Sequence, residues 1–299
     1  MVRLLRPPAL EKLKKRKYFP ERRRAIRLRR SHLTDESEAK NFDIKIADSR
    51  EELSKAFSLI HNVYVSLGLM DPHPSGMRID IFNALPQTKT FIARYKGEVA
   101  GTATLIFDSP LGLPSDEIYK EELDELRAEG RKLSEGSGLA LSSDFRKGNL
   151  FMYVYKIVFA YAQYANVDDI CIAINPKHSQ FYEEILLFEP IGELKYYPKV
   201  KGAPAILERI DLRTVDEKFR ETYSMQEFDC DLYTFFFTAH KGNPVEWSKK
   251  YPLNGMIMTP KDLHYFFTEK TDIFKQASEQ VMAYIRSCYP NYHFQEILN

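Results

Sequence analysis

Residues 132–149 read KLSEGSGLALSSDFRKGN and lead into a long apolar segment, Leu150 to Ala165. The pattern predicts a strand from Lys132 to Leu141, then a basic turn, then a helix over the apolar segment. Two glycines inside the strand indicate a bulge or a close approach of another backbone. This order of strand, basic turn and apolar helix decides the fold that we expect.

The segments on either side predict a mixed sheet with helices on both faces, an α/β (α+β) fold. Upstream, Phe42, Ile44 and Ile46 alternate with polar residues, as in a half-buried strand. Ser49 and Glu52 then form a capping-box pattern that predicts the start of a helix. Further elements are expected as a hairpin (Thr90 to Tyr95 and Val99 to Phe107), helices at Asp116 to Ala128 and from Pro176, and strands at Asp169 to Ile174, near 191–196 and near 205–210.

Three regions are expected along the 299 residues. Residues 1–40 form a basic and flexible tail, because Glu11 and Glu21 are the only acidic residues among its first thirty. Residues 41–212 form the domain that contains the sheet. Residues 213–299 form a helical, aromatic-rich extension.

The composition is that of a globular protein, with 44% apolar residues and a net charge of +1. Cys171, Cys230 and Cys288 are widely spaced, which predicts neither a disulfide framework nor a zinc site and favours a reducing cytoplasm. We expect no transmembrane segment and no secretory signal. The basic tail is a solubilising leader, or it docks the protein at an anionic membrane surface, on nucleic acid or on an acidic protein.

The turn Arg146, Lys147, Gly148 and Asn149 is a candidate phosphate site. The start of a helix offers free backbone N–H groups and the positive end of the helix dipole. The two cations add charge, and the glycine lets the backbone approach a ligand. A basic surface turn before a helix is the alternative.

Glu135 is the candidate base. It lies in the middle of a predicted strand, where a carboxylate is costly unless it is paired. Such a carboxylate has a raised pKa and suits proton abstraction. A structural ion pair is the alternative. His178 and Tyr182, on the helix that begins at Pro176, are candidate proton donors, with local hydrogen bonding and core packing as their alternatives.

Several segments, in order, resemble the FeeM-like family of N-acyl amino acid synthases, in the GNAT acyltransferase superfamily. This family is related to the acyl-homoserine lactone autoinducer synthases and takes long-chain acyl groups from acyl carrier protein. The resemblance covers about residues 42–212 and implies a GNAT-like sheet. It rests on Val63-Tyr64 with Gly68, Gly101 to Leu105, Asp108 to Pro114, Leu126-Arg127 with Gly130 to Glu135, Pro176 to His178 with Phe181-Tyr182, and Gly202 to Ala205.

The resemblance implies that Glu135 takes a proton from an amine that attacks an acyl thioester. Tyr182 or His178 protonates the departing thiolate. The thioester is expected at Gly136, Ser137 and Leu139, whose backbone N–H groups polarise its carbonyl, and its phosphate at residues 146–149. Tyr64, Thr102 and Thr104 are the expected substrate-binding residues.

Two departures argue against a homoserine lactone product. The autoinducer synthases carry an Arg three residues after this Glu, where this chain has Gly138. They also carry an Arg on the strand that here reads Gly101-Thr102-Ala103-Thr104. An amino acid, or a similar small amine, is therefore the expected acceptor.

The donor is expected to be acyl-phosphopantetheine on acyl carrier protein, or acyl-CoA, with no tightly bound cofactor and no metal. Arg146, Lys147, Lys177, Lys199 and Lys201 are expected to meet the acidic surface of the carrier protein. No specific nucleic acid is expected as a partner. Two alternatives stay open, an acetyl-CoA-dependent acetyltransferase and a non-catalytic binding module docked by its basic tail.

Overall fold

The computed structural model describes Arg24, Leu28 and residues 41–146, 148–224, 231–238, 244–254 and 258–298. The predicted tail apart from Arg24 and Leu28, together with Lys147 and Cys230, lies outside these residues. Among the described residues, no helix is long and apolar enough to cross a membrane.

The predicted elements are present in the predicted order. In the part that contains the sheet they are β1 (Phe42–Ile46), α3 (Arg50–Ser66), the 3-10 helix η2 (Ile81–Ala84), β2 (Lys89–Tyr95), β3 (Glu98–Phe107), α4 (Asp116–Ala128), β4 (Leu133–Leu141), η3 (Ser143–Phe145), α5 (Leu150–Tyr164), β5 (Asp169–Ile174), α6 (Pro176–Ile185), β6 (Glu189–Pro190), β7 (Lys195–Tyr197), η4 (Pro198–Val200) and β8 (Ala203–Asp211). The predicted strand near 191–196 is instead the short pair β6 and β7, on either side of Gly192.

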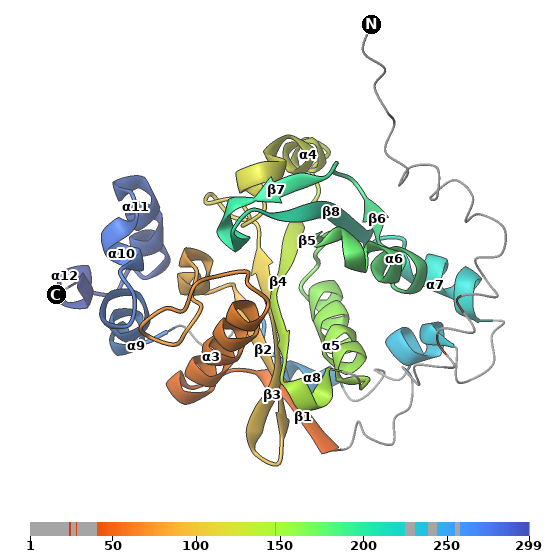
Figure 1. The fold of residues 1–299 in the computed structure, drawn as a ribbon, viewed down its shortest axis with the longest axis horizontal. Coiled ribbons are helices and arrows are strands. Elements are labelled where there is room, and N and C mark those ends of the chain that lie inside the picture. The colour runs from red at the N-terminus through yellow and green to blue at the C-terminus, as the bar shows by residue number, and fades with distance from the viewer. Residues whose placement is uncertain are drawn as a thin grey trace, which may run out of the picture.

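The eight strands form one mixed sheet in the order β1-β2-β3-β4-β5-β8-β6, and β7 also pairs with β8. Strands β1 to β4 are antiparallel neighbours, β4 and β5 are parallel, and β8 is antiparallel to β5. The parallel pair needs a crossover, which α5 supplies. The α/β prediction of a mixed sheet with flanking helices is thus confirmed (Figure 1).

Each face of the sheet has its own core. Along β5, Ile170 and Ile172 pack with α5, whereas Cys171 packs in the core that contains α3 and α4. This alternation follows from the period of two along a strand. Figure 1 shows α3 and α5 on opposite sides of the central strands. We call these the α5 face and the α3 face.

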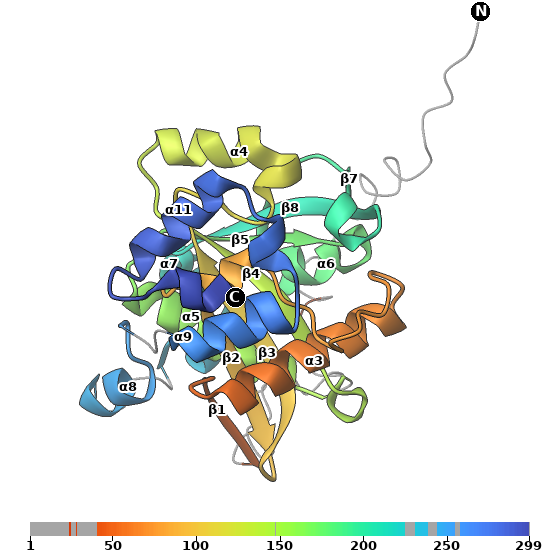
Figure 2. The ribbon, with the colours of Figure 1, turned by 90° about the vertical axis from the view of Figure 1, so that its left-hand side faces the viewer.

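The helical residues after the sheet are divided between the two faces. They form α7 (Val215–Tyr223), a π-helix (Thr234–Thr238), α8 (Pro244–Lys250), α9 (Pro260–His264), a π-helix (Tyr265–Glu269), α10 (Ile273–Gln276), α11 (Glu279–Cys288) and α12 (Phe294–Leu298). Phe219 and Phe236 belong to the core of the α5 face, whereas Phe266 and Ile285 belong to that of the α3 face. In Figure 2, α9 lies beside α3. Helix α12 packs against α9 and lies farther from α3 (Figure 1).

Candidate active site

Strands β4 and β5 separate in the middle of the sheet. Their pairing covers only Leu133 with Asp169, Ser134 with Ile170 and Glu135 with Cys171, although both strands continue beyond it. The register of β3 against β4 shifts between Thr102 and Thr104. On β4, opposite this shift, Gly138 has a φ of 59°, a backbone conformation that favours glycine. The glycines of the quoted segment therefore lie where the sheet opens.

A cavity of about 620 Å³ fills this opening. Its lining includes Ile170 and Ile172 from the α5 face and Ile106 and Ala205 from the α3 face. The cavity therefore has walls from both faces of the sheet and passes through the gap between β4 and β5. All its lining residues lie between Ile60 and Ala205.

Glu135 lies in the wall of this cavity, at the last β4–β5 pair. Its side chain is 3% exposed. Its Oε2 atom accepts two hydrogen bonds from Ser115, one from the backbone N–H at 2.8 Å and one from the hydroxyl at 2.6 Å. Burial raises the pKa of Glu135 to about 7, against the lowering effect of the two bonds from Ser115. A carboxylate with this pKa can exchange a proton with an amine near neutral pH.

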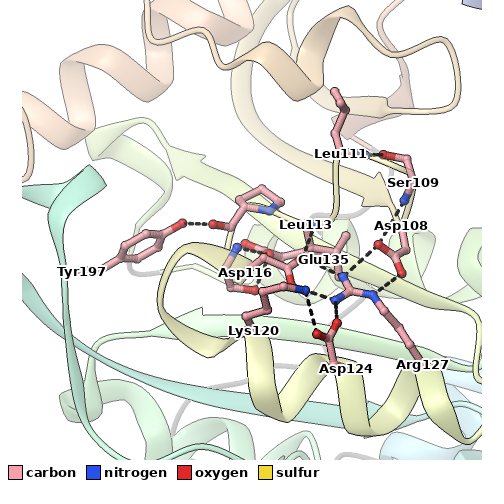
Figure 3. A network of polar contacts seen from close by, with 12 residues as sticks. Asp108, Ser109, Leu111, Leu113, Asp116, Lys120, Asp124, Arg127, Glu135 and Tyr197 are labelled. Carbon is pink, nitrogen blue, oxygen red and sulfur yellow. Dashed lines mark hydrogen bonds and ion pairs between the residues drawn. The ribbon is translucent and has the colours of Figure 1, made fainter. Parts of the chain in front are cut away.

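Contacts along its length hold in place the loop before α4, which contains Ser115. Tyr197 donates a hydrogen bond from its hydroxyl to the Pro114 carbonyl at 2.7 Å. Arg127, on α4, donates to the carboxylates of Asp108 and Asp116, which begin and end the loop, and to Asp124. These contacts surround Glu135 in Figure 3. These contacts therefore fix the loop that donates to the Glu135 carboxyl group.

Tyr182 lies in the wall on the α5 face, and it is buried. Its hydroxyl accepts a hydrogen bond from Tyr155 at 3.2 Å, which leaves its own proton for another acceptor. Burial raises the pKa of Tyr182 to about 12. The hydroxyl is therefore neutral at neutral pH and can donate to a thiolate.

Ser179, on the same helix as Tyr182, lies between two acidic residues. The Ser179 hydroxyl contacts the carboxylates of both Glu183 and Glu208. Burial raises the pKa of Glu208 to about 7, against the lowering effect of the Ser179 hydroxyl.

The predicted phosphate turn lies at the α5 end of the cavity. Arg146 and Gly148 line it, and Arg146 is exposed and donates to the Leu141 carbonyl at 3.2 Å. Asn149 does not line the cavity; its side chain is buried and lies 3.5 Å from the Tyr153 hydroxyl. His178 lines the cavity as an exposed side chain, and burial of part of its ring lowers its pKa.

The other predicted contacts lie along the gap. Gly136, Ser137 and Leu139 line the cavity, and so do Tyr64 and Thr104. Thr102 does not; it is buried and donates to the Phe91 carbonyl at 3.0 Å. The structure thus brings together all the predicted site residues that it describes, except Asn149 and Thr102.

Sequence reasoning missed several residues of the site. Ser115, which donates two hydrogen bonds to the Glu135 carboxylate, is the most important of them. Arg78 and Asp80, from the loop after α3, line the cavity. The segment Asp108 to Pro114, which carries part of the family resemblance, ends directly before Ser115. This adjacency is the one sequence signal that could have identified Ser115. Nothing in the local sequence around Arg78 pointed to the cavity.

Together these residues place a buried carboxyl group, Glu135, and a buried hydroxyl group, Tyr182, in the walls of one cavity. Within the described ranges, no group of three or more His, Cys, Asp or Glu side chains could hold a metal ion. Nucleophilic attack at a carbonyl group in the gap, with Glu135 on the α3 face and Tyr182 on the α5 face, is the chemistry that the arrangement suits.

Comparison with known proteins agrees with this geometry. A sequence profile described as N-acyl amino acid synthase FeeM matches residues 55–211. The solved structure of FeeM, an N-acyl amino acid synthase from uncultured soil microbes, is 30% identical with a TM-score of 0.53, over 59% of this chain and 93% of that one.

Two autoinducer synthases are more distant. The AHL synthase LasI is 16% identical with a TM-score of 0.44, over 57% of this chain and 89% of that one. BjaI, a CoA-dependent acyl-homoserine lactone synthase solved with SAM and isopentyl-CoA, is 17% identical with a TM-score of 0.43, over 64% of this chain and 98% of that one. A search among curated proteins found no match. Because the profile spans more than half of the sequence, the chain belongs to the N-acyl amino acid synthase FeeM family of acyltransferases, which have a GNAT-like fold.

Proposed function

We propose that the chain transfers a long-chain fatty acyl group from the phosphopantetheine thioester of acyl carrier protein to the amine of an amino acid. The observation that carries this proposal is the buried carboxyl group of Glu135 at the point where β4 and β5 separate. The base lies in the cavity wall, and its pKa of about 7 matches the task.

The reaction forms one bond and breaks one. The amine nitrogen attacks the thioester carbonyl carbon, the carbon–sulfur bond breaks, and an amide and a thiol result. Glu135 takes the proton that the amine loses. Tyr182 supplies the proton that the thiolate gains. Backbone N–H groups near Gly136 to Leu139 are the proposed donors to the developing oxyanion.

The two sides of the cavity differ in chemistry, which supports a fatty acyl donor. Phe151, Tyr155, Val158 and Phe181 provide an aromatic and aliphatic wall on the α5 face. Apolar walls of this kind bind alkyl chains through burial of apolar surface. Arg146 and Lys177 are exposed cations at the same end, and they suit the acidic surface of a carrier protein.

The test is an acyl-transfer assay with three donors. Purified protein receives dodecanoyl-acyl carrier protein, dodecanoyl-CoA or acetyl-CoA together with the twenty standard amino acids, and products are identified by mass spectrometry. We expect N-dodecanoyl amino acids, formed fastest from the carrier protein. Formation of N-acetyl products alone would overturn the long-chain assignment, and faster reaction with dodecanoyl-CoA would overturn the carrier protein as donor.

The same assay tests the base. In Glu135→Gln the amide oxygen can still accept from Ser115, but the side chain cannot take a proton. We expect kcat to fall by roughly 100-fold or more. Glu129→Gln, a change at an exposed residue beyond α4, is the matched control and should match wild type. An unchanged kcat in Glu135→Gln would show that Glu135 is not the base.

A further inference from the structure

Charged side chains gather in the cavity wall on the side of Glu135. They come from the loop after α3 and from η4: Arg78, Asp80 and Lys199. The charge of Lys199 lowers the pKa of the Glu135 carboxyl group, and the charge of Asp80 raises it. The proton transfers proposed above use none of these three residues.

Arg78 differs from its neighbour Lys199 in its partners. Lys199 lies 3.4 Å from Asp80 and 4.0 Å from Glu117. The Arg78 guanidinium lies over the Tyr64 ring, 4.5 Å from its centre, and forms no ion pair with any carboxylate in the described parts of the chain. Arg78 is therefore a half-buried cation in a cavity wall, oriented by an aromatic ring and still able to bind an anion.

The geometry limits what the anion can be. Glu135 and Arg78 line the same cavity, and the charges of both act on the hydroxyl of Tyr197, which also lines it. We therefore place an amine that gives its proton to Glu135 in the part of the cavity that Arg78 lines. A guanidinium group binds carboxylates through two parallel hydrogen bonds, and such bonds are stronger where water is excluded. A ligand with an amine and a carboxylate a few bonds apart could place its amine at Glu135 and its carboxylate at Arg78 at the same time.

We propose that Arg78 binds the carboxylate of the acceptor and that Lys199 assists it, so that the enzyme selects α-amino acids over simple amines. This inference rests on the proposed acyl transfer and adds to it the subsite that recognises the acceptor. In this arrangement the acceptor occupies the α3 face, and the acyl chain occupies the aromatic wall on the α5 face.

The experiment compares acids with their carboxamides. With dodecanoyl-acyl carrier protein as donor, kcat/KM is measured for whichever of the twenty L-amino acids reacts best and for its carboxamide, which keeps the amine and loses the negative charge. For wild type we expect kcat/KM to be roughly 10- to 100-fold lower for the carboxamide.

Variants of Arg78 then test whether this residue causes the preference for the amino acid over its carboxamide. In Arg78→Gln we expect kcat/KM for the amino acid to fall by roughly the same 10- to 100-fold, mainly through KM, while the carboxamide reacts as it does with wild type. Arg78→Lys keeps the positive charge but lacks the planar guanidinium group. Its kcat/KM for the amino acid should lie between the values for wild type and Arg78→Gln. The KM for the acyl donor should stay unchanged in both.

The matched control is Arg286→Gln on α11, whose ion-pair partner is Glu279 on the same helix. It should behave as wild type with both acceptors. Equal loss for acid and carboxamide in Arg78→Gln would overturn the subsite and leave acyl transfer standing. So would an equal kcat/KM of the wild-type enzyme for the acid and the carboxamide. If wild type acylates neither the amino acids nor the carboxamides, acyl transfer itself is wrong.

Discussion

Two opposed effects set the ionisation of Glu135. Burial raises the pKa of this carboxyl group, because the charged form loses hydration. The two hydrogen bonds from Ser115 favour the charged form and lower the pKa. The resulting pKa near 7 suits the proposed role of Glu135 as the base, and we expect Ser115 to hold this carboxyl group in position and to tune its pKa.

We expect Ser115→Ala to shift the pH profile of kcat/KM. The change removes the hydroxyl donor and keeps the backbone donor, so the pKa of Glu135 should rise by about one unit. Because the reaction needs the ionised carboxylate, activity at pH 7 should fall and should recover as the pH approaches 9. A pH series on wild type and Ser115→Ala measures this. An acid limb at the same pH in both proteins would show that the hydroxyl does not tune Glu135.

The loop that carries Ser115 and helix α4 behave as one element, because Arg127 joins them. Its guanidinium forms bidentate contacts with Asp108 and Asp116, with distances from 2.6 to 2.9 Å, and a further contact with Asp124 (Figure 3). These carboxylates raise the pKa of Arg127 further above its usual value. Arg127 thus bridges three carboxylates and offsets part of their mutual repulsion.

Loss of Arg127 should weaken both the fold and the site. In Arg127→Met the unpaired carboxylates remain, and we expect the free energy of unfolding to fall by about 3 kcal/mol. The loop should loosen around Ser115, so kcat should fall as well. Denaturant unfolding and the acyl-transfer assay measure the two effects. Lys120→Met, which removes an exposed partner of Asp124, is the control; if Arg127→Met unfolds at the same denaturant concentration as this control, the brace is not structural.

On the scale of the whole molecule, residues after the sheet complete both cores. Phe266 is fully buried, and its ring lies edge-on to Phe57 of α3, with 5.4 Å between the ring centres. Phe236 lies 5.4 Å from Phe159 of α5 on the opposite face. The helices after residue 212 therefore support the two helices that form the walls of the cavity.

We expect Phe266→Ala to destabilise the whole protein. Removal of a fully buried ring leaves a cavity and should lower the free energy of unfolding by about 3–5 kcal/mol. Fluorescence and circular dichroism should follow one shared unfolding transition, as in a single cooperative unit. Lys261→Ala, at an exposed position of α9, is the control. Two separate transitions would show that α9 to α12 fold apart from the sheet.

Local patterns were enough to predict most elements of the sheet region. The alternation from Phe42 to Ile46 and the apolar run from Asp169 to Ile174 match β1 and β5. Ser49 caps α3 as predicted, by accepting from the Glu52 N–H. These features depend on neighbours within a few residues, and the sequence displays such neighbours directly. Glu135 was also predictable, because a carboxylate inside a strand is costly wherever the strand lies.

What the sequence by itself determined was therefore the order of elements, the family resemblance and the buried, strand-borne carboxyl group of Glu135. Tertiary structure alone decided which distant residues surround that carboxyl group. Ser115 meets Glu135 from 20 positions away, and Arg78 and Lys199 come from separate loops. Thr102 and Thr104 lie two apart on β3, yet only Thr104 lines the cavity, because the strand register shifts between them. Contacts of this kind depend on how the chain closes on itself, which no local pattern of residues encodes.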